Sequence, residues 1–320
     1  MGSEALIALA IAFAVVTGAN DGGALVSTGL RVPALSVPVS VTILVAVVVA
    51  GPLVLGTAVA ETLTGRLVPE GPDSATLLAI GFVIAVVVVW MLARAGLPTS
   101  LTLAVIGGIS GAGLGMGSTV EWSAVVRVLA IGMVAPFVGA VLAMLATRAW
   151  HVAPDAPYLP TVRRAHVAAF ALQCAAYGTN DGQKVLVLFL AATAAGGGNG
   201  DDLAWWTYPV VALAFAVGTA IGLPKLAASL GTGIMSTRPT HAVTAEFAAA
   251  AAVLGSTAIA TPVSMTQSIA GALVGVGVHD GYRRLRWHTV RMMAGAWAVT
   301  LPASLGLAAL VGLIVSSLPS

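Results

Sequence analysis

The sequence predicts an all-α polytopic membrane protein, with about ten membrane segments in two inverted-topology repeats that contain broken or re-entrant helices. Hydrophobic residues make up 58% of the 320 residues and charged residues only 8%, whereas a soluble domain carries about 25% charged residues. The mean hydropathy is +1.01. A Gly-x-Asn-Asp-Gly motif occurs at 18–22 and again at 178–182, each time inside a long apolar stretch. A duplicated bundle of membrane helices explains all three observations.

The long apolar stretches are the expected membrane segments, because a spanning helix needs about 20 apolar residues. They cover residues 5–30, 37–60, 74–93, 98–116, 122–149, 164–190, 205–230, 241–258, 261–278 and 288–316. The first and sixth contain the Asn-Asp motifs, and we expect each helix to be broken there. The fourth and ninth begin at a proline and are rich in Gly, Ser and Thr, so each either spans the membrane or re-enters it. The first lacks the positive leading region of a signal peptide, so we expect it to remain as a membrane segment.

The arginines between these stretches predict the orientation of the chain. If ten segments cross the membrane and the N-terminus lies outside, nine arginines fall in inside loops and one or two in outside loops. The nine are Arg31, Arg94, Arg148, Arg163, Arg164, Arg238, Arg283, Arg284 and Arg286. Because basic residues gather on the cytoplasmic side, both termini are expected on the outer side of the plasma (inner) membrane.

The number of crossings predicts how the two halves are related. Five crossings in each half would invert the second half relative to the first, as in many secondary transporters. We expect a first transmembrane repeat over 1–150, a cytoplasmic connecting loop over 151–163 and a second, inverted transmembrane repeat over 164–320. Further matches between the halves support the duplication: residues 56–59 resemble 218–221, and residues 111–115 resemble 271–277.

The composition argues against several other classes of protein. The net charge of +2 is small and forms no basic stripe, so no nucleic acid partner is expected. The sequence offers no water-accessible nucleophile and no zinc-site spacing, so we expect neither enzyme activity nor a cofactor beyond a coupling ion. The single cysteine, Cys174, cannot form an internal disulfide. His151 and His166 fall near the connecting loop and are expected at the membrane interface. The expected partners are the transported anion, membrane lipid and, in a homo-oligomer, further copies of the chain.

The Asn-Asp motifs are candidates for the binding of a coupling cation. Residues 5–17 are too few to cross about 30 Å of hydrocarbon, so the first motif should lie at membrane depth. A carboxylate at that depth is expensive and is usually kept for function. Hard cations prefer oxygen ligands, so Na+ or H+ is expected at Asp21 and Asp181. Asn20 and Asn180 are expected to support it. The alternative is a plain turn between two helices, where Asn and Asp are common.

Two matched Pro-x-Ser-x-Thr segments, at 98–102 and 262–266, are candidates for an anion site. Proline is well placed in the first turn of a helix, and Ser or Thr at a helix start can cap free N–H groups. Capping alone would explain one copy. A helix N-terminus also attracts anions, and two copies at matched places favour that function for Ser100, Thr102, Ser264 and Thr266.

Two further charged residues lie inside apolar segments of the second half. Lys184 follows Asp181 by three residues and shares its helix face. It either pairs with Asp181, contacts an anion or occupies the place of a cation. Glu246 follows a predicted helix start at Pro239. It serves either as a helix-start carboxylate, which we prefer, or in a proton path.

These motifs resemble the inorganic phosphate transporters usually called PiT, over almost the whole chain. That family carries Gly-Ala/Ser-Asn-Asp-x-x-Asn twice, which residues 18–24 and 178–184 resemble. It also carries Leu-Pro-Val-Ser-Thr-Thr-His in each half, which residues 97–103 and 261–267 resemble. The resemblance implies symport of inorganic phosphate with Na+ or H+ by alternating access. It places the cation at the two Asn-Asp motifs. It implies phosphate binding by Ser100, Thr102, Ser264, Thr266, Lys184 and Gln267.

The chain departs from the family pattern at its ligand positions. The last Asn of the signature is Ala24 in one half and Lys184 in the other. The family histidine is Leu103 or Gln267. Each change removes a ligand, and a lysine can take the place of a bound Na+. We therefore expect fewer Na+ sites than in Na+-coupled members, with H+ as the alternative coupling ion. The alternatives for the function are transport of another tetrahedral oxyanion such as sulfate, or an uncoupled anion channel.

Overall fold

The computed structural model describes residues 2–56, 58–67, 73–97, 99–150, 158–197, 203–227 and 233–318. Within these residues every regular element is a helix. In chain order they are α1 (Ser3–Thr17), η1 (Gly18–Gly22), α2 (Gly23–Gly29), α3 (Val37–Leu55), α4 (Ala58–Glu61), η2 (Thr62–Arg66), α5 (Ser74–Arg94), α6 (Leu101–Gly115), α7 (Trp122–Trp150), α8 (Tyr158–Ala195), α9 (Thr207–Leu226), α10 (Pro239–Thr257), α11 (Met265–Gly281), η4 (Tyr282–Arg284) and α12 (Trp287–Ser317). The predicted all-α class is confirmed.

Several helical stretches have the length and composition of membrane spans. In the described part of the chain there are six: Ser3–Gly29, Val37–Val54, Ser74–Arg94, Trp122–Ala149, Thr207–Leu226 and Trp287–Ser317. The protein is therefore a multi-pass membrane protein. The fourth and ninth predicted segments are shorter, since α6 has 15 residues and α11 has 17. At about 1.5 Å per residue, neither helix is as long as the hydrocarbon core of about 30 Å is thick.

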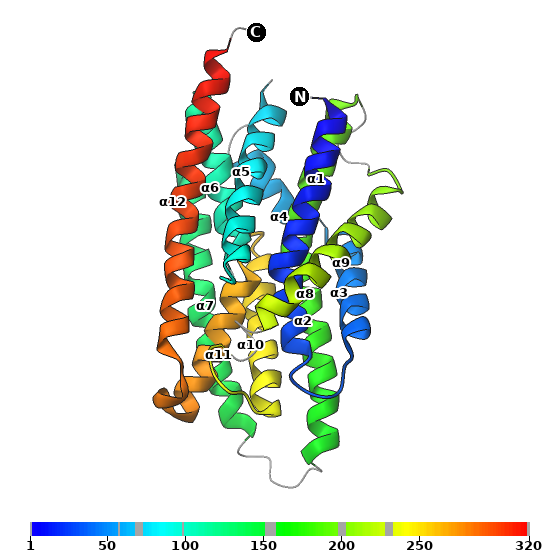
Figure 1. Cartoon of the computed structure of the whole chain (residues 1–320), viewed down its shortest axis with the longest axis vertical. Coiled ribbons are helices and arrows are strands. Elements are labelled where there is room, and N and C mark those ends of the chain that lie inside the picture. The colour runs from blue at the N-terminus through cyan, green and yellow to red at the C-terminus, as the bar shows by residue number, and fades with distance from the viewer. Residues whose placement is uncertain are drawn as a thin grey trace.

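Two helical hairpins approach each other from opposite ends of the molecule. In Figure 1, α5 and α6 occupy the upper half, whereas α10 and α11 occupy the lower half, and the turns of both hairpins lie near the middle. The long helices α7, α8 and α12 run beside them (Figure 1). Both chain termini lie at the same end of the molecule (Figure 1), as the prediction of an even number of crossings requires.

The prediction that the Asn-Asp motifs break their helices is wrong. The first motif forms a wide π-helical turn, Gly18–Gly22, within one continuous helical stretch from Ser3 to Gly29. The second lies inside α8, which is an uninterrupted α-helix of 38 residues. Backbone groups at membrane depth must be hydrogen-bonded internally, and a helix that tolerates glycine meets this need without unwinding. A π-turn adds one residue to the turn and is frequent at functional sites.

The predicted connecting loop, 151–163, needs a second adjustment. Residues 151–157, which include His151, lie outside the described part of the chain. Helix α8 begins at Tyr158, so the last residues of the predicted loop are helical. Pro98 and the Gly/Asp-rich residues 198–202 also lie outside the described residues.

Glycines allow each hairpin helix to pack closely on the last helix of the other half. A Cβ on Gly111 of α6 would lie 2.2 Å from the Leu305 carbonyl oxygen of α12. A Cβ on Gly275 of α11 would lie 2.1 Å from the Ala140 carbonyl oxygen of α7. These are the matched glycine segments of the two halves, 111–115 and 271–277. Small residues at such spacing let membrane helices approach each other closely.

The two helices that carry the Asn-Asp motifs follow the same pattern, because each packs closely on a helix of the other half. A Cβ on Gly222 of α9 would lie 1.8 Å from the Ala19 carbonyl oxygen of η1. A Cβ on Gly178 of α8 would lie 2.3 Å from the Val47 carbonyl oxygen of α3. Each Asn-Asp motif is therefore packed against a helix of the opposite half.

We expect Gly111→Ala to lower the free energy of unfolding by about 1–3 kcal/mol, because overpacking forces the α6 and α12 backbones apart. Gly306→Ala on α12 is the control, since Gly306 is exposed and a Cβ there meets nothing within 4 Å. It should leave stability unchanged or raise it by up to about 1 kcal/mol, because alanine favours helix more than glycine. Thermal unfolding in detergent measures both. Equal stability of the two variants would show that α6 and α12 do not pack this closely.

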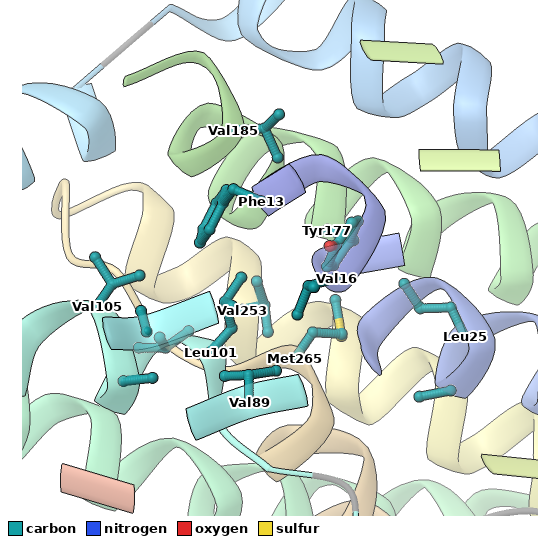
Figure 2. Close-up of a cluster of buried hydrophobic side chains, with 14 of the residues drawn as sticks. Phe13, Val16, Leu25, Val89, Leu101, Val105, Tyr177, Val185, Val253 and Met265 are labelled. Carbon is teal, nitrogen blue, oxygen red and sulfur yellow. The ribbon is translucent and has the colours of Figure 1, made fainter. Parts of the chain in front are cut away.

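A buried core fills the space between the hairpins and the motif helices. Figure 2 shows that its side chains come from α1, α2, α5, α6, α8, α10 and α11, and thus from both halves of the chain. Phe13 and Val16 of α1 are buried in it with Tyr177 of α8 and Met265 of α11. Polar groups inside this core are removed from water, so each needs a partner.

Candidate substrate and cation site

The turns of the two hairpins are joined by a reciprocal pair of hydrogen bonds. The Thr102 hydroxyl donates to the Val263 carbonyl oxygen at 2.7 Å, and the Thr266 hydroxyl donates to the Thr99 carbonyl oxygen at 3.0 Å. Thr102 and Thr266 occupy equivalent places in the duplicated Pro-x-Ser-x-Thr segments, as do Thr99 and Val263. The two segments therefore meet in one place, and each holds the backbone of the other.

Each Asn of the duplicated motif holds the hairpin turn of its own half. The Asn20 amide donates to the Thr99 carbonyl oxygen at 3.0 Å and accepts from the Thr99 N–H at 3.2 Å. The Asn180 amide donates to the Thr261 carbonyl oxygen at 3.1 Å and accepts from the Val263 N–H at 3.1 Å. We expected both Asn side chains to support a cation. Their amides satisfy backbone groups of the turns that precede α6 and α11, and their support of a cation stays a prediction.

The serines of both segments are helix N-caps, which was the alternative to an anion site. The Ser100 hydroxyl accepts from the Leu103 N–H at 3.2 Å, and the Ser264 hydroxyl accepts from the Gln267 N–H at 3.4 Å. The Ser264 hydroxyl also lies 2.9 Å from that of Thr266. The positive ends of the α6 and α11 dipoles thus point to the place where the hairpin turns meet, which favours an anion there.

Lys184 is fully buried and makes three hydrogen bonds from its ammonium. Nζ lies 2.5 Å from Asp181 Oδ1, 2.6 Å from the Thr102 hydroxyl and 2.9 Å from the Val263 carbonyl oxygen. Of the three alternatives for Lys184, the structure shows the pairing with Asp181, whereas a contact with phosphate stays a prediction. A carboxylate, a hydroxyl and a carbonyl are also the oxygen ligands that a hard cation prefers. All three donors of the ammonium are used.

Asp21 has a different set of neighbours, although it is the counterpart of Asp181. Its Oδ1 accepts from the Asn20 amide at 2.6 Å, and its Oδ2 accepts from the Tyr177 hydroxyl at 3.3 Å. The same Asn20 amide donates to the Thr99 carbonyl oxygen, which also accepts from Thr266. A carboxylate, a carbonyl and a hydroxyl oxygen gather here too, as they do around Lys184. Ala24 supplies no ammonium at the equivalent position of this half.

The buried charges at this centre do not cancel. Asp21 and Asp181 are near enough for the charge of one to act on the other, and Lys184 acts on both. Two carboxylates and one ammonium sum to −1 when all are ionised. A net charge that is buried without compensation is costly, so this site favours the binding of one additional monovalent cation or proton.

Two sequence interpretations outside this centre need correction. His166 is fully buried rather than interfacial, and its Nδ1 lies 2.9 Å from Glu246 Oε2. Its Nε2 lies 2.8 Å from the Gly29 carbonyl oxygen. Glu246 therefore lies against His166, about two turns into α10, rather than acting as a helix-start carboxylate; its alternative role in a proton path stays a prediction. Burial lowers the pKa of the nearby Arg31 guanidinium to about 10, while the charge of Glu246 acts in the opposite direction.

The sequence interpretation missed Tyr177 and the Thr99 backbone, and the structure places Gln267 to one side. Tyr177 precedes Asp181 by four residues on the same helix face, and that spacing could have pointed to it. Gln267 lines an apolar cavity between α7 and α12, and its predicted contact with phosphate stays a prediction. The other predicted site residues lie at the meeting point of the hairpins.

Comparison with known proteins places this geometry in a family. The phosphate transporter family matches the chain over residues 17–156 and 148–308. A probable low-affinity inorganic phosphate transporter of Bacillus subtilis is 29% identical over 97% of this chain and 96% of its own length. A protein of the same description from Mycobacterium leprae is 31% identical over 93% of this chain and 74% of its own. A solved structure titled the sodium-dependent phosphate transporter superposes with a TM-score of 0.83 at 16% identity, covering 98% of both chains. These relatives are transporters, in agreement with the expectation that the chain is not an enzyme.

Proposed function

This chain belongs to the phosphate transporter family, and we propose on that basis that it is a secondary transporter of inorganic phosphate. Phosphate would bind where the two hairpin turns meet. Two helix N-termini converge there, and the hydroxyls of Ser100, Thr102, Ser264 and Thr266 lie beside them. Backbone N–H groups and hydroxyls are the donors that a tetrahedral oxyanion needs. The convergence of these two helix starts is the observation that carries the proposal.

The coupling cation in this proposal binds at Asp21, and Lys184 acts as a built-in cation at Asp181. The two carboxylates have equivalent sets of oxygen neighbours, but only the Asp181 set includes an ammonium among the described residues. One net negative charge then remains for one Na+ or H+. A chain with one such place couples fewer cations to each phosphate than a chain with two.

Alternating access in this proposal uses two inverted repeats, 1–150 and 164–320. The reciprocal Thr102 and Thr266 hydrogen bonds support it, as do the crosswise glycine contacts of α6 with α12 and α11 with α7. Hairpins that enter from opposite ends would open the centre to one side at a time. In this proposal both termini lie on the outer side of a plasma membrane, as the distribution of arginines between the ten predicted segments favours.

Uptake of labelled phosphate into proteoliposomes tests the function. The protein should accumulate phosphate above its external concentration when a Na+ gradient or a pH gradient is imposed. Each gradient is applied alone, at constant pH or in the absence of Na+. The gradient that drives accumulation identifies the coupling ion, because the other should have no effect. A tenfold excess of sulfate should leave uptake almost unchanged.

Each alternative function has its own result in the same assay. Equilibration without accumulation under either gradient would indicate an uncoupled anion channel. Inhibition by sulfate as strong as by unlabelled phosphate would indicate a transporter of tetrahedral oxyanions without selectivity. Liposomes without protein give the background for both.

A further inference from the structure

A cavity of about 500 Å³ lies between α7 and α12, outside the hairpin helices α6 and α11. Apart from Gln267, the residues that line it are apolar or aromatic. Met133 and Phe137 on its α7 wall are 65% and 71% exposed, so the cavity opens on the outer surface of the helical bundle. In a multi-pass membrane protein that surface faces lipid.

The chemistry of the lining excludes phosphate and favours hydrocarbon. An oxyanion in this cavity would lose its hydration and gain few donors, which is costly. A hydrocarbon chain loses nothing there and gains close contacts. The volume is within the range of about 300–1,000 Å³ that is typical of ligand pockets.

Arginines stand at one end of both walls of the cavity. On α12, Arg291 shares a helix face with Ala294 and Ala298, which line the cavity. On α7, Arg148 shares a helix face with Phe137. Arg148 and Arg291 are both exposed. Arg148 is in the last turn of α7 and Arg291 near the start of α12, and these two helix ends lie at the end of the molecule opposite the chain termini (Figure 1).

The length of the cavity matches one leaflet of a bilayer. Its α12 wall begins at Val290, next to Arg291, and ends at Leu301, a separation of 11 residues or about 16 Å along a helix at about 1.5 Å per residue. On α7, Arg148 follows Ala140, the last lining residue of that helix, by eight residues. Half of the hydrocarbon core of a bilayer is about 15 Å thick, so a lipid with its headgroup beside Arg291 would place its acyl chain along the cavity.

We propose that this cavity binds an acyl chain of an anionic phospholipid, whose headgroup pairs with Arg148 and Arg291. Positive charges at one end, and an apolar cavity that extends about one leaflet from Arg291, match the two parts of such a lipid. The acyl chain would also contact Gln267, which lies in the first turn of α11 and donates its N–H to the Ser264 cap. The bound lipid would thus support the hairpin that holds one side of the substrate site.

Quenching of Trp297 fluorescence by brominated lipids tests this inference. Trp297 lines the cavity. Its fluorescence is obtained by subtracting the emission of the Trp297→Phe variant from that of the parent protein. The proteins are reconstituted in phosphatidylcholine that contains increasing fractions of phosphatidylglycerol brominated in its acyl chains. Brominated phosphatidylcholine serves as the neutral probe. We expect the anionic probe to bind at least threefold more strongly than the neutral one.

Two arginine variants separate this site from ordinary lipid contact. Arg148→Gln with Arg291→Gln should bring the preference for the anionic probe to about one. Arg127→Gln, near the opposite end of α7 and also exposed, should leave it unchanged. Equal quenching by the two probes in the parent protein, or an equal loss in the Arg127 variant, would overturn the proposal. Protection of Trp297 from both probes, together with a dimer in solution, would show that a second copy covers the cavity and would overturn it too.

Discussion

Replacement of Lys184 by methionine is expected to lower the free energy of unfolding by about 3–5 kcal/mol, because it leaves the buried Asp181 carboxylate without a cation. Thr102 and the Val263 carbonyl oxygen would lose a donor as well. Phosphate uptake should fall to background, since both hairpin turns depend on this contact. Thermal unfolding in detergent and uptake in proteoliposomes measure the two effects.

The control for this prediction is the second lysine of the chain. Lys225 is exposed. In the described part of the chain, its ammonium donates one hydrogen bond, to the Arg94 carbonyl oxygen. Lys225→Met should change stability by less than about 0.5 kcal/mol, as is usual for surface substitutions. If Lys184→Met is no more harmful than Lys225→Met, the buried ion pair does not hold the site together.

Sodium provides a sharper test of the built-in cation. If the ammonium occupies the place of a cation, Lys184→Asn leaves an oxygen-lined space beside Asp181. Added Na+ should then raise the midpoint of thermal unfolding of Lys184→Asn more than K+ at the same ionic strength does. The parent protein should show a smaller difference between the two salts. Equal effects of Na+ and K+ on the variant would indicate that Lys184 does not replace a bound Na+.

The duplication made much of the centre predictable from sequence. Matched order and spacing of the Asn-Asp and Pro-x-Ser-x-Thr segments pointed to Asp21, Asp181 and the hydroxyl residues. The serine caps were predictable because capping is a local property of the chain. The departure of Lys184 from the symmetric pattern was visible too, and it marks the largest chemical difference between the halves.

Other features depend on packing that a sequence does not display. Glycines next to an Asn-Asp pair suggested a broken helix, yet their role is to let α9 and α3 approach closely. The partners of Asn20 and Asn180 lie about 80 residues away, so their hold on the hairpin turns could not be seen. The same holds for His166 and Glu246, whose pairing depends on the packing of α8 against α10.

The same substitution at the two pseudo-equivalent aspartates is expected to have opposite effects on stability. Asp21→Asn removes a carboxylate that has no ammonium beside it, so the folded state loses a costly charge and should be as stable or more stable. Asp181→Asn leaves Lys184 buried without a counter-charge and should cost about 3–5 kcal/mol. Asparagine has nearly the shape of aspartate, so packing is not the cause of either effect.

Transport should respond differently from stability. Both variants should lose accumulation of phosphate, but Asp21→Asn should do so as a well-folded protein, because it lacks the place for the coupling cation. Thermal unfolding and gradient-driven uptake, measured on the same preparations, separate these outcomes. Equal stability of the two variants would contradict the predicted difference between Asp21 and Asp181. Undiminished accumulation by Asp21→Asn would mean that the coupling cation binds elsewhere. A stable Asp21→Asn protein that exchanges phosphate without accumulating it would identify Asp21 as the residue that couples the flux of phosphate to the flux of the cation.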